Sequence, residues 1–111
     1  MSSSPDDLVE RKLGEYFRGA DATRAGEALA LVEDPRVQLA AIKLADGDVE
    51  MLERYALLAE IDWRDVVGPA ESPRYLAAGP HAADRPDVAG LIAGDRAEYE
   101  SWLATPGPHA G

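Results

Sequence analysis

Residues 34–48, DPRVQLAAIKLADGD, carry the feature that most limits how this chain can fold. Between Asp34 and Asp46 only Arg36 and Lys43 are charged, although the chain has 21 acidic and 11 basic residues. On a helical wheel the apolar residues of this segment cover nearly the whole circumference. A helix that is apolar on all sides is a buried helix. We therefore expect a buried central helix over 35–45, surrounded by other helices.

Helix-start signals occur at three places in the first half of the chain. Ser4, Asp34 and Asp48 are residue types that cap helix N-termini, and each precedes an apolar pattern with helical spacing. Pro5 and Pro35 then stand at the first helical position, where proline is favoured. These signals predict helices that begin at residues 5, 35 and 49.

Apolar spacings of three, four and seven residues over most of the chain predict an all-α, single-domain bundle of about five or six helices. Gly19 is the expected end of the first helix, and Asp34-Pro35 is the expected end of the second. Residues 62–68 are either a new helix capped by Asp62 or the end of a long one. Residues 87–105 are one helix kinked at Gly94-Asp95 or two short ones. A strand reading of the apolar runs beside Pro35 is the weaker alternative.

Residues 68–86 hold four prolines and two glycines, which predicts a long irregular connection. The single domain is expected to span residues 1–111, with frayed tails at 1–4 and 105–111. Since no apolar run approaches 18 residues and no signal-peptide pattern begins the chain, we expect a cytoplasmic protein.

Charge and residue usage limit the partners. A net charge of −10 disfavours nucleic acid and anionic membranes, so a protein partner, if there is one, is expected to be basic. The chain has no cysteine, which excludes disulfides and thiolate sites.

Patterns for catalysis or metal binding are weak. The segment DGDVE at 46–50 resembles the start of a calcium loop, but the sixth and twelfth positions of such a loop would be Met51 and Leu57 instead of glycine and a carboxylate. His81 and Asp84 would supply two metal ligands with no third. We therefore assign no catalytic, cofactor-binding or metal residue.

The residues expected to contact a partner are Leu57, Ile61, Arg74 and Tyr75. Leu57 and Ile61 fall toward the polar side of their helix, among charged neighbours, which is typical of an interaction patch. Tyr75 and Arg74 stand in the irregular connection and are residue types that dominate binding interfaces. The alternative for Leu57 and Ile61 is that the 70–85 segment covers them through Tyr75 and Leu76.

Residues 36–75 resemble a stretch in small acidic helical proteins of high-GC bacteria. The resemblance lies in a Gly-Asp break, a following amphipathic helix, the motif DWRDV and the pattern E-x-P-x-Y, here with Ser72 before the proline. It covers about a third of the chain. No activity is attached to that group, so the resemblance implies no functional residue.

These observations predict a non-enzymatic interaction or regulatory protein that neutralises a basic partner, as immunity proteins and antitoxins do. The first alternative is a carboxylate-using enzyme or small-molecule binder with its site on 68–86. The second is a structural module that forms homodimers or larger homo-oligomers.

Overall fold

The computed structural model describes residues 4–109, and all regular secondary structure in this range is helical, as predicted. This range holds seven α-helices and one short 3-10 turn instead of five or six helices. In chain order they are α1 (Pro5–Tyr16), α2 (Gly19–Leu29), α3 (Pro35–Ala45), α4 (Val49–Asp62), α5 (Arg64–Glu71), α6 (Pro73–Ala77), η1 (Ala82–Asp84) and α7 (Val88–Ala104).

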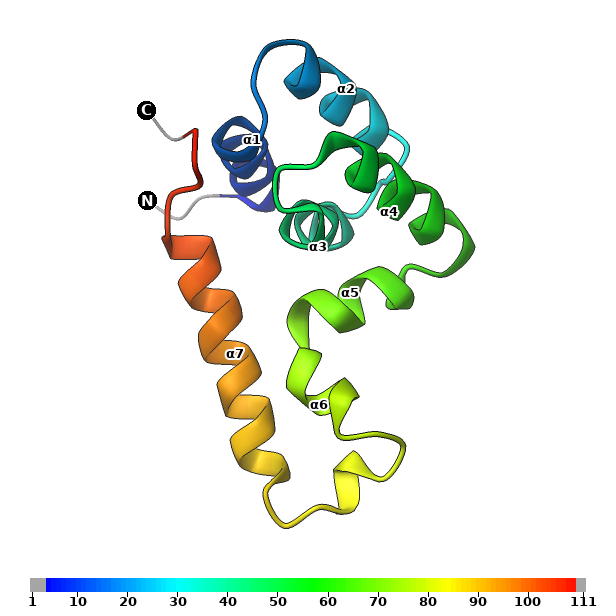
Figure 1. Cartoon of the computed structure of the whole chain (residues 1–111), viewed down its shortest axis with the longest axis vertical. Coiled ribbons are helices and arrows are strands. Elements are labelled where there is room, and N and C mark those ends of the chain that lie inside the picture. The colour runs from blue at the N-terminus through cyan, green and yellow to red at the C-terminus, as the bar shows by residue number, and fades with distance from the viewer. Residues whose placement is uncertain (1–3, 110–111) are drawn as a thin grey trace.

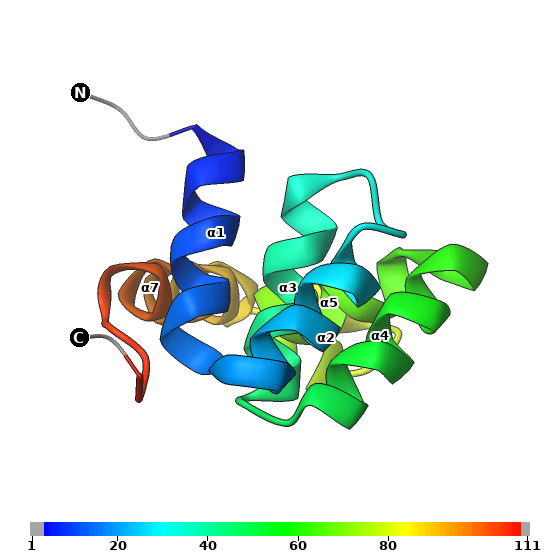
Figure 2. The same cartoon turned by 90° about the horizontal axis from the view of Figure 1, so that it is seen from above.

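The helices form a body and an extension. Figure 1 shows α1 to α4 gathered at one end, while α5 and α6 lead away from them and α7 runs back as a straight rod. The principal extents of 47, 33 and 23 Å reflect this elongated shape. Figure 2, seen from above, places α2 and α4 side by side on the part of the body away from α7.

Helix α3 has the predicted bounds and contacts α1, α4 and α5. Six of its eleven side chains are buried, namely Val37, Leu39, Ala40, Ala41, Ile42 and Ala45. Arg36 stays exposed at its start, and Lys43 is half-buried near its end. The near absence of charge in 35–45 is therefore explained by packing on several sides, because burying an unpaired charge is costly.

The predicted N-caps are confirmed. Ser4 and Asp7 form a reciprocal capping box at α1, in which the Asp7 backbone N–H donates to Ser4 Oγ at 3.2 Å. The Asp34 carboxylate caps α3, and the Asp48 carboxylate accepts from the backbone N–H groups of Glu50 and Met51 at the start of α4.

Two helix boundaries differ from the prediction. Helix α1 ends at Tyr16, and Gly19, expected to end it, instead begins α2 with a φ of +58°, a value that glycine adopts without strain. Helix α2 ends at Leu29, before Asp34-Pro35. At this end the side-chain amide of Gln38 donates to the carbonyl oxygens of Leu29 and Val32 at 2.9 and 2.6 Å and so pairs carbonyl groups that a helix end leaves open.

The prediction of an irregular connection over 68–86 is wrong for much of its length. Helix α5 continues through Gly68 and Pro69 to Glu71, α6 follows after one residue, and η1 covers three more. Pro73 occupies the first position of α6, where its missing N–H costs nothing. A new helix does begin in this segment, but Trp63 holds the N-cap position and Asp62 is the last residue of α4, where its carboxylate accepts from the Arg64 backbone N–H at 3.1 Å.

The C-terminal tail is also more ordered than predicted, over the part that the structure describes. The backbone N–H of His109 donates to the Glu15 carbonyl oxygen at 2.7 Å, and that of Gly107 donates to Glu15 Oε1 at 3.3 Å. A Cβ at position 107 would lie 2.8 Å from the Glu15 carbonyl oxygen, so this contact requires glycine. Residues 105–109 therefore pack on α1, while 1–3 and 110–111, also expected to fray, lie outside the described residues.

Candidate partner-binding surface

Four large apolar side chains are exposed along α2, α4 and the residues that follow each of them. The exposed fractions are 60% for Leu31, 57% for Leu57, 83% for Ile61 and 47% for Trp63. Leu57 and Ile61 are one turn apart on α4, Trp63 directly follows that helix, and Leu31 follows the end of α2. We call these four residues, with the acidic residues that line the hollows beside them, the α2–α4 surface.

Two shallow hollows, each of about 300 Å³, lie along the line where α2 and α4 meet. Leu31 borders both of them. One hollow reaches Trp63 and the buried Val37 of α3, and the other reaches Leu57. Leu31, Leu57 and Trp63 therefore border the hollows, whereas Ile61 lines neither of them and adjoins Leu57 one turn along α4.

Acidic residues line these hollows. The five acids are Glu27, Glu33, Asp34, Glu53 and Glu60, and they face a single lining base, Arg24. The Arg24 guanidinium donates to Glu53, a hydrogen bond that raises the pKa of Arg24 above its ordinary value. Within residues 4–109, Glu27, Glu33 and Glu60 form no ion pair. The α2–α4 surface is thus apolar with a negative rim.

Two bases of α4 and α5 lie outside the hollows. Arg64 donates two hydrogen bonds to the Asp62 carboxylate, which lower the pKa of that carboxyl below its ordinary value. Arg54 is exposed one turn before Leu57. Basic side chains therefore also stand three residues from Leu57 and from Ile61, although they do not line the two hollows.

The structure separates the predicted partner-binding residues into two places. Leu57 and Ile61 belong to the α2–α4 surface, whereas Arg74 and Tyr75 lie on α6, beyond α5 (Figure 1). Residues 70–85 pack toward α7, and Leu76 lies near Gly68, so they do not cover Leu57 or Ile61. The sequence analysis did not assign Leu31 or Trp63 to this surface, because both fit an apolar helical pattern.

The backbone N–H groups of Arg74 and Tyr75 bind a buried carboxylate of α7. Asp95 is only 3% exposed, and its oxygens accept from the backbone N–H groups of Arg74 and Tyr75 at 3.0 and 3.1 Å. The Arg74 guanidinium adds contacts of 3.3 Å to Asp95 and to Glu98. Burial alone would raise the pKa of Asp95, but the hydrogen bonds from Arg74 and Tyr75 outweigh it and lower that pKa. Asp95 therefore caps α6 from a different helix.

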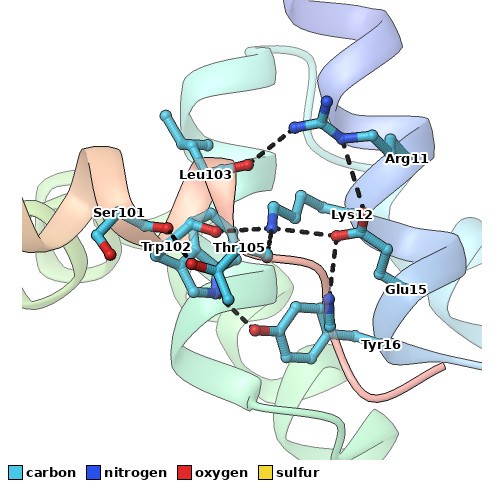
Figure 3. Close-up of polar contacts among 9 residues, drawn as sticks. Arg11, Lys12, Glu15, Tyr16, Ser101, Trp102, Leu103 and Thr105 are labelled. Carbon is cyan, nitrogen blue, oxygen red and sulfur yellow. Dashed lines mark hydrogen bonds and ion pairs between the residues drawn. The ribbon is translucent and has the colours of Figure 1, made fainter. Parts of the chain in front are cut away.

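A buried lysine fastens α7 to the body at its other end (Figure 3). Lys12 of α1 is 1% exposed, and its Nζ donates to the carbonyl oxygens of Trp102 and Thr105, both at 2.7 Å. The same Nζ lies 3.1 Å from Glu15 Oε1. An ammonium has three N–H donors, so these three contacts use all of them. Lys12 is placed as a cap of the α7 C-terminus, where cations are stabilised by the helix dipole.

Neighbouring side chains strengthen this junction. Arg11 donates to the Leu103 carbonyl oxygen at 2.8 Å, and Trp102 Nε1 donates to the Tyr16 hydroxyl at 2.8 Å (Figure 3). Lys12 Nζ also lies 4.8 Å from the centroid of the Trp102 ring. The carbonyl oxygens at the C-terminal end of α7 thus accept hydrogen bonds from side chains of α1.

A second charged cluster lies between α3, α5 and α7. Arg36 donates two hydrogen bonds of 2.9 and 2.8 Å to the Glu71 carboxylate, and its guanidinium lies 5.9 Å from the Trp63 ring centroid. Burial and the nearby Glu71 carboxylate raise the pKa of Tyr99 to about 12, although Arg36 acts in the opposite direction. A phenol with so high a pKa stays neutral at physiological pH.

Within residues 4–109, no group of three or more histidine, aspartate or glutamate side chains is placed to hold a metal ion. His81 is exposed at the start of η1. No helix of the described residues is both long enough and apolar enough to cross a membrane. The chain was compared with protein-family models, with curated proteins and with solved structures, and no match was found.

Proposed function

We propose that this chain is a non-enzymatic interaction module that binds and neutralises a basic protein through the α2–α4 surface. The single observation that carries the proposal is that three exposed apolar side chains, Leu31, Leu57 and Trp63, line the same two hollows as five acidic residues, with the exposed Ile61 one turn from Leu57. An apolar centre with a polar rim is the usual anatomy of a protein interface.

The negative charge of the chain and of the α2–α4 surface favours a basic partner. The chain as a whole carries −10, and the acids at the α2–α4 surface add a local negative field. Such a field speeds the approach of a basic partner and repels acidic ones, so it contributes more to association rate and specificity than to contact energy. The apolar side chains supply the part of the affinity that salt does not screen.

A photo-crosslinking amino acid tests the proposal in cells of the native host. It is placed at Leu57 and, as a matched control, at Ile92, an apolar residue of α7 with 47% exposure. The expected result is a crosslink to a basic protein from position 57 and none to that protein from position 92. The purified partner should then bind the parent chain and the Ile92→Lys variant equally, and bind Leu57→Lys with Ile61→Lys at least tenfold more weakly. Equal binding to all three contradicts the proposal.

A homo-oligomer formed through α7 is the second candidate. Asp95 is the one buried side chain among the 17 residues of α7, and Ile92 stands beside a hollow lined by three alanines of that helix. Repulsion between two chains of charge −10 opposes this assembly. Sedimentation distinguishes the candidates, because a dimer that Ile92→Lys dissociates and Leu57→Lys leaves intact would favour α7.

A further inference from the structure

We infer that the α2–α4 surface accepts an amphipathic α-helix with basic residues on both flanks, an inference that rests on the function proposed above. The occupant is a helix of the basic partner, laid along the line where α2 and α4 meet, with its apolar face on Leu31, Leu57 and the adjoining Ile61. The geometry of the apolar side chains and the distribution of acids both point to this occupant.

The apolar side chains have the spacing of a helix-binding surface. Leu57 and Ile61 are separated by four residues of one helix, which places them about 6 Å apart on the same face. A ligand helix repeats its own apolar side chains at the same interval, so neighbouring turns of the two helices interdigitate. The hollows on either side of Leu31 provide room for side chains that project from the ligand. Recognition of an apolar helix face in a groove between helices is a recurring mode of peptide binding.

The acids occupy both sides of the line where α2 and α4 meet. Glu27 belongs to α2 and Glu33 follows it, whereas Glu53 and Glu60 belong to α4. A ligand helix lying between these two sides would face a negative rim on each flank. Lysine or arginine on both flanks of its apolar stripe therefore complements the surface.

Other occupants fit less well. Within residues 4–109 the structure has no strand whose edge an extended peptide could join. Helix α7 of a second copy has an apolar side chain to offer in Ile92, but its exposed Glu98 and Glu100 outnumber Arg96 and would meet a rim of the same sign. Nucleic-acid phosphates would meet the same repulsion.

A synthetic 18-residue peptide tests the inference by isothermal titration calorimetry against the full chain. Its leucines recur at intervals of three and four residues, and lysines fill both flanks. A control peptide has the same composition, with the leucines scattered around the helix. We expect saturable binding of the amphipathic peptide, at least tenfold tighter than that of the scattered peptide, and an affinity that falls as salt is raised.

Matched variants locate the binding. Leu57→Lys with Ile61→Lys should weaken binding at least tenfold, whereas Ile92→Lys should leave it unchanged. Thermal melts establish that each variant is folded, and Leu57→Ser with Ile61→Ser replaces the lysine pair if that pair is unfolded. Equal affinity for the two peptides, or equal loss in the α7 variant, overturns the inference.

The test separates this inference from the proposed function. If a basic partner crosslinks at position 57 and the amphipathic peptide does not bind, the helical occupant is wrong and the proposed function stands. If the peptide binds only by joining two copies of the chain, sedimentation shows two chains in each complex. That result also contradicts a partner helix bound to a single α2–α4 surface. Absence of both the crosslink and peptide binding contradicts the function and the inference together.

Discussion

Lys12 Nζ donates a hydrogen bond to the backbone carbonyl oxygen of Trp102 at 2.7 Å and lies 4.8 Å from the centre of the same residue's indole ring. One buried cation on α1 thus holds both the main chain and the side chain of a residue 90 positions away. This junction fixes the C-terminal end of α7, a helix that otherwise contributes little to the core.

Replacement of Lys12 by methionine should lower the free energy of unfolding by about 3 kcal/mol. Methionine keeps an unbranched apolar stem but leaves Glu15 and two carbonyl oxygens without their donor, and removal of one partner from a buried ion pair costs on that scale. Urea denaturation measures the change. Lys43→Met is the matched control, because Lys43 is half-buried and forms no ion pair within residues 4–109. Equal stability of the two variants would contradict the role given to Lys12.

The Asp95 carboxylate should stabilise the fold in a pH-dependent manner. Its pKa is lowered in the folded chain, so its contribution is fully present above the ordinary value of 3.8 and is lost as pH falls through the folded value. We expect Asp95→Ala to destabilise the chain at pH 7 by about 2 kcal/mol, the scale for leaving buried donors unpaired. This difference from the parent should shrink as the pH is lowered below 4. Thermal melts over this pH range measure it, and a difference that stays constant would contradict the assignment.

Tyr99 should ionise at much higher pH than an ordinary tyrosine. Burial and the Glu71 carboxylate raise its pKa from 10.0 to about 12. The stability that it contributes is therefore present below pH 10 and is lost as pH rises toward 12. The difference between ultraviolet titrations of the parent and Tyr99→Phe isolates this group. A step near pH 10 in the difference between the two titration curves would show that Tyr99 is exposed to solvent and would contradict this prediction.

A charge placed inside α3 should unfold the chain. Ile42 is 0% exposed, and an unpaired carboxylate at that position costs several kcal/mol, which is comparable with the stability of a typical domain. We expect Ile42→Asp to be unfolded by circular dichroism at 25 °C. Lys43→Asp introduces the same residue at the next position, where the side chain is half-buried, and should stay folded. Two folded variants would mean that α3 is not part of the core.

The starts of α1, α3 and α4 follow from local signals in the sequence. The caps at Ser4, Asp34 and Asp48 depend on residues two or three positions away, and the apolar circumference of 35–45 is contained in one helix. Helix α6 differs, because its cap is Asp95, which lies 20 or more residues further along the chain. Because this contact is distant in the sequence, only the prolines and glycines of 68–86 are visible locally, and they predict an irregular connection.

Only half of the exposed apolar residues at the α2–α4 surface could be predicted from local pattern. Leu57 and Ile61 fall on the polar side of a helix whose other face is already apolar, so their pattern alone marks them. Leu31 and Trp63 fit apolar helical spacing, and their exposure follows from the early end of α2 and from the break between α4 and α5. The end of α2 has no signal in the neighbouring residues as clear as a proline or an N-cap, whereas Asp62, a residue type that caps helices, marks the break between α4 and α5.

The most direct test of the account compares two variants that have the same net charge. In the first, Glu27, Glu33 and Glu60 at the α2–α4 surface become glutamine. In the second, the exposed residues Glu10, Asp84 and Glu100 elsewhere become Gln, Asn and Gln. The measurement is the dissociation constant of the basic partner captured at position 57, at low and at physiological salt. The account predicts an affinity lowered at least tenfold at low salt, with a weaker salt dependence, for the first variant only. Equal losses in the two variants would show that the partner responds to total charge and not to the α2–α4 surface.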